Sequence, residues 1–396
     1  GAKRTLTIDL GEDNRTFDVA DNPLVNTDLA LGFYDYYKYN YTNITGTGGL
    51  TKAGAGRMDI WTDPNWTGTP FSGGITVTGG TLGIRLSEAN DTALGDGTNV
   101  LSLLNDGRLV VMGTYSTSGR VASIEFSGNN VAQYSSWDAS ATLNVTDAIN
   151  RLEHGVLEFR GSYVSSNYYD IWGTAGNGNL VVGEWAIANP SVNGMLPAYY
   201  VFTGYVPTDN DVATFANYTT EVTSATLTAR ATPTGISAAE KTDQTANWTM
   251  TADVTTYALR TAYNIAQSGG DFNLTILSGG LIVNGDSTID SLVNFGGGGS
   301  AEGLVYVKSN ATATLTNAVT SSDLTKFGGG TLALTSFNSL GDIFVQAGTL
   351  ASAEGMSLGS GNNVYLANGT TLRSLGHQFY VDNPDIENVY DQNVQI

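Results

Sequence analysis

The feature that most constrains this chain of 396 residues is a motif that occurs twice, over residues 50–60 and again over residues 324–334. Both copies begin Leu-Thr-Lys, continue through a glycine-rich step and end in an alternating apolar segment. The agreement continues downstream in the same order, with residues 75–82 matched by 343–350 and residues 93–100 matched by 357–364. Short alternating strands separated by glycine, used more than once, are typical of a chain built by stacking similar coils.

Burial explains why such a chain stacks its coils. Each short strand buries only one face, and a single coil cannot shield that face from water, whereas coils stacked about 4.8 Å apart bury a continuous apolar interior. The pattern therefore predicts an all-β fold, a right-handed parallel β-helix (β-solenoid) with coils of roughly 20–25 residues. A β-sandwich also suits short alternating strands, but sandwiches rarely repeat a long motif with its downstream strands in order. In the solenoid, alternation points six side chains inward: Leu50, Met58, Ile60, Leu324, Leu332 and Leu334.

Changes in residue composition and in the strand pattern divide the chain into five segments. They are an N-terminal strand and aromatic segment (1–45), a first solenoid repeat region (46–130), an aromatic-rich central region (131–260), a second solenoid repeat region (261–377) and an acidic C-terminal tail (378–396). The central region is expected to be an insertion that contains one short helix. Thr146 can cap this helix, Ile149 and Leu152 share one face, and Gly155 fits the position after its C-terminal end.

Net charge and residue usage exclude several function classes. With 37 acidic and 17 basic residues, the net charge of −20 leaves no basic patch for nucleic acid or for an anionic membrane surface. No apolar run is long enough to cross a membrane, so no membrane insertion is expected. The absence of cysteine excludes disulfides and thiolate metal sites. The chain begins at Gly1 without an initiator Met, which suits a mature, processed product.

Metal and cofactor chemistry has little support in the sequence. The two histidines, His154 and His377, lie far apart and do not make a zinc or iron site. His154, at the end of the expected helix, suits a structural role beside the helix dipole. No cofactor is therefore expected, although the high negative charge is compatible with a structural Ca²⁺ ion between acidic loops.

The repeated motif resembles the autotransporter-associated β-strand repeat of secreted bacterial passenger domains. The usual form of that repeat is Leu-Thr-Lys-x-Gly-x-Gly, then Leu-x-Leu, then Thr-x-Val-x-x-Gly-Thr-Leu, which residues 76–82 match and residues 344–350 match more loosely. The stretches 183–188 and 200–205 also look like the middle region of large proteins with these repeats, found especially in verrucomicrobia and their relatives. Clear motifs cover about half of the chain.

The resemblance implies a parallel β-helix exported to the cell surface or released outside the cell, with a structural or adhesive role. One departure is that an acidic tail ends the chain where the family has a translocator barrel. This implies either that the barrel has been removed or that a compact relative is exported by another route.

Three functions are compatible with a β-solenoid, and a carbohydrate-active enzyme is the least favoured. Lyases and hydrolases on parallel β-helices need two carboxylates on one glycosidic bond, or a basic residue beside a bound cation. Arg and Lys are too few to line a groove for acidic sugars. The acidic residues are scattered, with no spacing that brings two together on one face: Asp59, Asp63, Asp96, Asp106, Glu125, Asp138 and Asp170. Catalysis is not predicted, and no catalytic residue is assigned.

The second hypothesis is a surface adhesin or glycan-binding fragment. Aromatic side chains gather in residues 33–41 and 131–220 and could bind surface glycans. The same residue types are also enriched in cores and subunit interfaces, and packing is the favoured interpretation of these aromatics.

Asn-x-Thr triplets are the strongest modification signal. The chain has eleven, against roughly four expected by chance, although Asn at turn ends and Thr at strand starts also favour the pair locally. Asn65, Asn90 and Asn368 lie beside turn residues and are the best acceptors for glycan. The complete set is Asn14, Asn40, Asn43, Asn65, Asn90, Asn144, Asn217, Asn247, Asn273, Asn310 and Asn368.

The first hypothesis, and the favoured one, is a structural subunit of an extracellular filament, sheath or surface layer whose partner is another copy of itself. Solenoid ends expose strand edges that template further pairing, and a head-to-tail contact that does not close makes a filament. Residues 1–20 or 378–396 are expected to dock on the next subunit. The apolar side chains expected in that contact are Leu6, Ile8 and Leu10 at one terminus and Val389, Val394 and Ile396 at the other. The alternative is that both segments cap their own solenoid.

Overall fold

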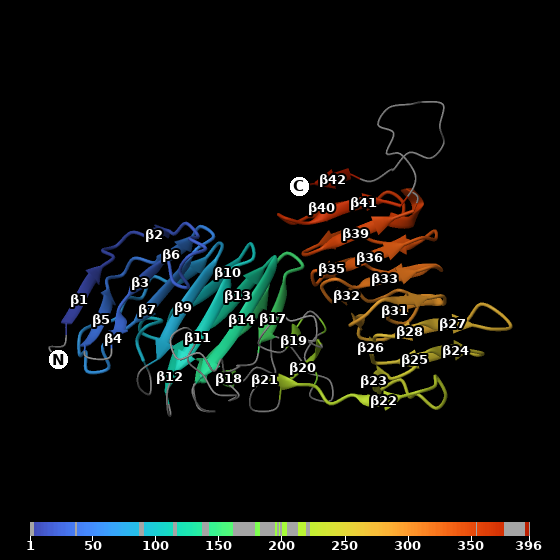
Figure 1. The fold of residues 1–396 in the computed structure, drawn as a ribbon, viewed down its shortest axis with the longest axis horizontal. Coiled ribbons are helices and arrows are strands. Elements are labelled where there is room, and N and C mark those ends of the chain that lie inside the picture. Colours follow the sequence, from blue (N-terminus) through green and yellow to red (C-terminus); the bar gives the residue numbers. More distant parts are fainter. Residues whose placement is uncertain are drawn as a thin grey trace. The chain divides into compact units, whose positions relative to one another are not determined.

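The protein is an all-β solenoid of stacked parallel strands with almost no helix, as the sequence predicts (Figure 1). The computed structural model describes residues 4–35, 38–86, 91–113, 117–136, 142–160, 179–182, 195, 198, 200–203, 213–218, 222–353, 355–375 and 393–395. Internal contacts divide the chain into two compact units. Unit 1 comprises Gly1–Leu196, Tyr200–Asp211 and Ala216–Thr223, and unit 2 comprises Pro197–Tyr199, Val212–Phe215 and Ser224–Ile396.

The described residues of unit 1 form four sheets. Sheet I has the order β16-β13-β10-β8-β6-β2, sheet II the order β21-β20-β19-β17-β14-β11-β9-β7-β3, and two three-stranded sheets have the orders β1-β5-β4 and β12-β15-β18. The strands are β1 (Arg4–Asp9), β2 (Arg15–Asp18), β3 (Leu29–Leu31), β4 (Phe33–Asp35), β5 (Lys38–Thr45), β6 (Leu50–Ala53), β7 (Arg57–Trp61), β8 (Ile75–Val77), β9 (Thr81–Leu86), β10 (Val100–Leu104), β11 (Arg108–Gly113), β12 (Ser118–Val121), β13 (Ser123–Ser127), β14 (Asn129–Ser136), β15 (Thr142–Val145), β16 (Ile149–Arg151), β17 (Val156–Arg160), β18 (Asn179–Val182), β19 (Tyr200–Thr203), β20 (Thr214–Tyr218) and β21 (Val222–Ser224). Strands β20 and β21 include residues of both units.

Three sheets are formed by the part of unit 2 that the structure describes. Sheet III has the order β22-β23-β26-β29-β32-β35-β38-β40-β42, sheet IV the order β24-β27-β30-β33-β36-β39-β41, and sheet V the order β25-β28-β31-β34-β37. The strands are β22 (Thr228–Arg230), β23 (Lys241–Gln244), β24 (Trp248–Met250), β25 (Val254–Thr256), β26 (Ala258–Thr261), β27 (Ile265–Gln267), β28 (Asn273–Ile276), β29 (Gly280–Val283), β30 (Ser287–Ile289), β31 (Leu292–Phe295), β32 (Gly303–Val307), β33 (Thr312–Leu315), β34 (Val319–Ser321), β35 (Leu324–Phe327), β36 (Thr331–Leu334), β37 (Ser339–Leu340), β38 (Ile343–Val345), β39 (Thr349–Ser352), β40 (Asn363–Leu366), β41 (Thr371–Ser374) and β42 (Asn393–Gln395). A single-turn 3₁₀ helix, η2, spans Gly355–Leu358.

The core of each unit consists of inward columns of apolar side chains, mostly aliphatic, from successive coils. The six residues predicted to point inward, Leu50, Met58, Ile60, Leu324, Leu332 and Leu334, are all at most 1 % exposed, which confirms the alternation argument. Leu50 pairs with Ile75 and Leu324 with Ile343, so one coil holds 25 residues at the first repeat and 19 at the second. Each added coil therefore extends the same columns and removes more apolar surface from water.

The two repeats occupy the same position in their coils. Strand β6 pairs with β8 as β35 pairs with β38, and β7 pairs with β9 as β36 pairs with β39. The glycines that follow the strands agree as well: φ is 78° at Gly54 and 75° at Gly328, in the region that L side chains rarely adopt. Sheet I of unit 1 therefore corresponds to sheet III of unit 2, and sheet II corresponds to sheet IV.

The prediction of a helix between Thr146 and Gly155 is wrong. Ile149 begins strand β16, which pairs in parallel with β13, and a turn with positive φ at Glu153 and His154 leads into β17. A spacing of three between Ile149 and Leu152 also fits a strand followed by a turn, and Ile149 is buried while Leu152 is 38 % exposed. Hydrogen bonds with the neighbouring strand favour the strand conformation here; for example, Ile124 N–H donates to the Ala148 carbonyl.

Candidate functional site

Each repeat buries the lysine of its Leu-Thr-Lys motif completely. Lys52 Nζ donates to the carbonyls of Ala53 and Gly54 at 2.8 Å and of Gly79 at 3.1 Å. Lys326 Nζ donates to the carbonyls of three residues in the same way: to Gly328 at 2.5 Å, and to Gly330 and Ala347 at 2.6 Å. In both units the ammonium thus ties the corner of its own coil to the corner of the next one.

Glycine makes room for this lysine. The turn carbonyls face inward only because the chain turns through a left-handed residue at Gly54 or Gly328. A Cβ on Gly348 would lie 2.3 Å from Lys326 Nζ, so the next coil also needs glycine beside the ammonium. The Leu-Thr-Lys motif and the glycines after it therefore have a structural role, forming a corner of the coil. The alternation that puts Leu50 inside and Thr51 outside puts Lys52 inside too, and this signal was present in the sequence although no role was predicted for the lysine.

Burial lowers the pKa of Lys326 to about 7, and it also lowers the pKa of Lys52, where Asp18 and Asp28 oppose the effect. A buried amine with a low pKa is a common nucleophile or base. Lys326 Nζ already makes three hydrogen bonds to backbone carbonyls, and the side chain has no exposed surface, so it cannot reach a substrate.

The low pKa makes the stability of unit 2 depend on pH. Between about pH 7 and the ordinary lysine pKa of 10.5, the folded state binds fewer protons at Lys326 than the unfolded state does. The free energy of unfolding contributed by this group should therefore rise with pH across that window and stay constant below it. We expect wild-type protein to gain stability relative to Lys326→Met between pH 7 and pH 10. Urea unfolding of both proteins across the window measures this; a constant difference would contradict it.

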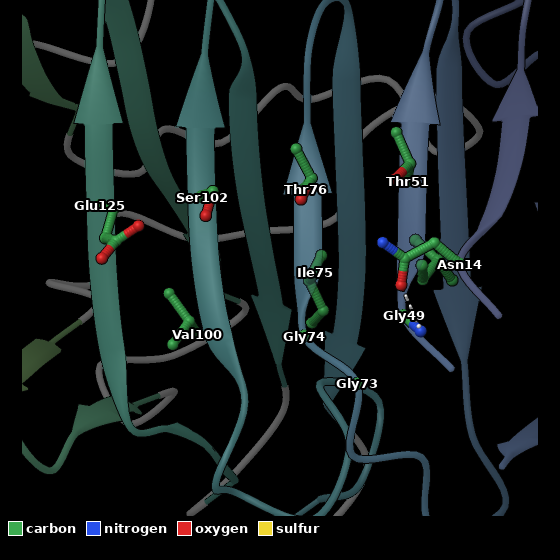
Figure 2. A pocket seen from close by; sticks show the side chains of 11 residues that line it. Asn14, Gly49, Thr51, Gly73, Gly74, Ile75, Thr76, Val100, Ser102 and Glu125 are labelled. Atoms are coloured by element: carbon green, nitrogen blue, oxygen red, sulfur yellow. Dashed lines mark hydrogen bonds between the residues drawn. The ribbon is translucent and has the colours of Figure 1, made fainter. Parts of the chain in front are cut away.

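A polar depression of about 250 Å³ lies on the outer face of sheet I (Figure 2). Thr51, Thr76, Ser102 and Glu125 stand on four successive strands in direct register, β6, β8, β10 and β13. Gly49, Gly73 and Gly74 form part of its floor, while Asn14 and Val100 flank it. Asn14 Oδ1 accepts a hydrogen bond from Gly49 N–H at 2.9 Å, which fixes the amide at the rim. The depression is thus lined mainly by hydroxyl, amide and carboxylate groups, beside the apolar Leu50, Ile75 and Val100.

Three pairs of aromatic side chains in the described part of the chain pack ring against ring. Tyr41, from the run 33–41, meets Trp61 edge-on at 4.9 Å, and both are buried. In unit 2, Phe344 and Tyr365 stack at 4.8 Å with an angle of 3° between their rings, so their facing surfaces cover each other. These contacts fit the packing interpretation. Most of the stretch 131–220 and the side chains of residues 33–39 lie outside the described residues.

The Asn-x-Thr acceptors are spread over both units. Asn14, Asn65, Asn247, Asn310 and Asn368 have exposed side chains, Asn40, Asn144 and Asn273 are half-buried, and Asn43 is buried. Asn43 Oδ1 accepts from Asp63 N–H, so this asparagine serves the turn after β7. Asn90 and the side chain of Asn217 lie outside the described residues. Glycosylation at the exposed sites stays a prediction.

The described residues that were predicted for assembly lie on, or directly after, strands at the edges of their sheets. Strand β1 pairs with β5, and its apolar face changes from 58 % exposed at Leu6, through half-buried Ile8, to 1 % exposed at Leu10. Val394 lies in β42 and pairs with Val364 of β40, so this part of the tail extends sheet III of its own chain. Val389 and Ile396 lie outside the described residues.

No family model, curated protein or solved structure matches this chain. Within the described ranges, no helix is long and apolar enough to span a membrane, and no cluster of three acidic or histidine side chains forms a group that could hold a metal ion. The function must therefore be argued from the solenoid itself and from its outer surface.

Proposed function

We propose that the protein is an extracellular structural subunit that assembles head to tail by strand addition. The observation that supports this most directly is the first coil, residues 4–31. Its strands β2 and β3 are the last strands of sheets I and II, and β1 is the outer strand of its own sheet. An edge of parallel strands presents a row of backbone donors and acceptors that another strand can complete.

The backbone of β2 has a defined open side. Arg15 N–H donates to the Gly49 carbonyl and Val19 N–H to the Ala53 carbonyl, so alternate residues of β2 bond to β6. Thr16 and Asp18, which lie between them, direct their N–H and C=O groups away from β6. Both side chains are exposed.

A matching edge closes unit 2. Strand β42 is the last strand of sheet III and β41 the last strand of sheet IV. Thr371 N–H donates to Gly348 and Leu375 N–H to Ser352, so Leu372, which lies between them, directs its backbone groups away from β39. The two edges are of the same parallel kind.

The equivalence of the repeats sets the register in which two copies would join. Leu372 extends the inward column of Leu332 and Leu350, and Leu29 begins the corresponding column that continues in Met58. A second copy that continues sheet IV with its own sheet II therefore places Leu29 opposite Leu372 and Ala30 opposite Arg373. In this register the apolar columns run on without interruption, which favours the contact.

Exposed apolar side chains near both edges support the same contact. Leu6, Leu24 and Val25 of the first coil are 58 %, 89 % and 49 % exposed. In unit 2, Leu375, directly after β41, is 42 % exposed, and Phe337, just before β37 at the end of sheet V, is 59 % exposed. Large exposed apolar groups gathered at an end are typical of protein interaction sites. The charge of −20 opposes association at low ionic strength, so salt should promote assembly by screening it.

A cross-linking experiment tests the assembly and its register, because the chain has no cysteine of its own. Ala30→Cys protein is mixed with Arg373→Cys protein in salt and oxidised; we expect a covalent dimer with one copy of each, since directly paired strands meet disulfide geometry. Ala30→Cys mixed with Thr371→Cys, two residues out of register, is the matched control. Negative-stain microscopy of wild-type protein should show end-to-end polymers. Single particles at every concentration and salt level would refute the function, whereas polymers without the expected dimer would refute only the register.

A further inference from the structure

The polar depression on sheet I has features that strand addition does not require. The hydroxyls of Thr51, Thr76 and Ser102 have no hydrogen-bond partner among the described residues, and the same holds for the Glu125 carboxylate. Because Asn14 Oδ1 is used by Gly49 N–H, its amide nitrogen is left to donate from the rim (Figure 2). Five polar side chains from five strands or turns thus border one hollow.

The corresponding column of unit 2 shows that the fold does not demand these residues. Thr325, the counterpart of Thr51, is buried and donates to Glu302 Oε1 at 2.5 Å. Its neighbours in that column are Phe344 and Tyr365, where unit 1 has Thr76 and Ser102. The same repeat therefore carries an aromatic, self-packed outer column in one unit and an open polar column in the other. Because the inward side chains stay apolar in both units while the outer column changes, the outer column of unit 1 is free to serve a ligand.

The lining selects the chemistry of that ligand. None of the eleven lining residues is basic, so phosphate, sulfate or uronate groups would find no countercharge and would be repelled by Glu125. A lone carboxylate is too little for a metal site. Hydroxyls that both donate and accept, spaced about 4.8 Å apart along the column, match a chain of neutral hydroxyls, and a carboxylate can accept from two of them. The Val100 side chain offers an apolar flank for the C–H face of a ring.

We propose that this depression binds a neutral oligosaccharide, with Thr51, Thr76, Ser102, Asn14 and Glu125 hydrogen-bonding its hydroxyl groups. The volume suits one or two sugar rings rather than a larger ligand, because it lies just below the usual range of drug-sized pockets. Strong binding at one such site is not required, since an assembly would present many copies of it side by side.

Affinity electrophoresis in native gels tests this proposal, with dextran, hydroxyethyl cellulose and soluble starch as neutral probes and polygalacturonate as the charged comparison. We expect at least one neutral polysaccharide to retard the wild-type protein. The double variant Thr76→Val, Ser102→Ala should lose retardation, with a roughly tenfold weaker affinity, because it removes two hydroxyls and leaves the strands intact.

The matched control is the double variant Thr331→Val, Thr349→Val. These threonines form a second outward column in direct register, on sheet IV and outside the depression. Retardation should survive in this control. Two results would overturn the proposal: no neutral probe retards the protein, whether or not polygalacturonate does, or both double variants lose retardation equally. Neither of these results bears on strand addition, which the cross-linking experiment tests separately.

Discussion

Replacement of Lys326 by methionine is expected to lower the free energy of unfolding of unit 2 by about 3 kcal/mol while leaving unit 1 folded. Methionine keeps the length and the apolar stem of the side chain but offers no donor. The carbonyls of Gly328, Gly330 and Ala347 then lose the donor that they share in a buried corner. Leaving buried acceptors unsatisfied costs more than the hydrogen bonds gain when formed, which is why a single substitution should have so large an effect.

Hydrogen exchange resolved by mass spectrometry measures this effect separately for each unit. Peptides from β35 to β39 should lose protection in Lys326→Met, whereas peptides from β6 to β9 should not. Lys52→Met is the matched variant and should reverse the pattern, because Lys52 holds the corresponding corner of unit 1. Lys308→Met, at a half-exposed lysine of unit 2, is the control for loss of a positive charge. Unchanged protection in both Lys326→Met and Lys52→Met would mean that the lysines do not stabilise these turns.

The solenoid could be predicted from the sequence because the inward side chains of each coil form a repeating pattern. Leu50, Met58 and Ile60 follow the apolar alternation that a strand requires, and their counterparts at residues 324–334 do the same. The sequence therefore contains the same strand pattern twice. The segment around Ile149 shows where this reasoning fails. Two apolar residues three positions apart are compatible with a helix or with a strand. Only pairing with the parallel strand β13, about 25 residues earlier in the chain, decides between them.

The polar depression could not be predicted from the sequence. Thr51, Thr76, Ser102 and Glu125 are separated by more than twenty residues from one to the next, and these coils and the coil after the second repeat vary in length from 19 to 26 residues. Without the register of the strands, nothing indicates that these side chains form one column. The lysine corner differs, because alternation within a single strand already placed Lys52 and Lys326 inside.

Replacement of Thr16 by proline is expected to abolish end-to-end assembly without unfolding the first coil. The Thr16 N–H faces away from β6, so proline removes no hydrogen bond within the chain, and the strand conformation of Arg15 suits a residue that precedes proline. At the open edge, proline withholds a donor from an incoming strand and places its ring in that strand's path. The covalent dimer of Ala30→Cys and Arg373→Cys proteins should therefore disappear when the Ala30→Cys copy also carries Thr16→Pro.

Phe17→Pro is the matched control, because the neighbouring residue has the opposite backbone orientation. Arg15 and Val19 donate toward β6, and the period of two gives Phe17 the same direction, so proline at position 17 breaks a bond inside the chain. We expect Phe17→Pro to lower the melting temperature and Thr16→Pro to leave it nearly unchanged, as measured by circular dichroism. Polymers that persist in Thr16→Pro protein would show that β2 does not carry the contact, and assembly would then have to proceed through another edge.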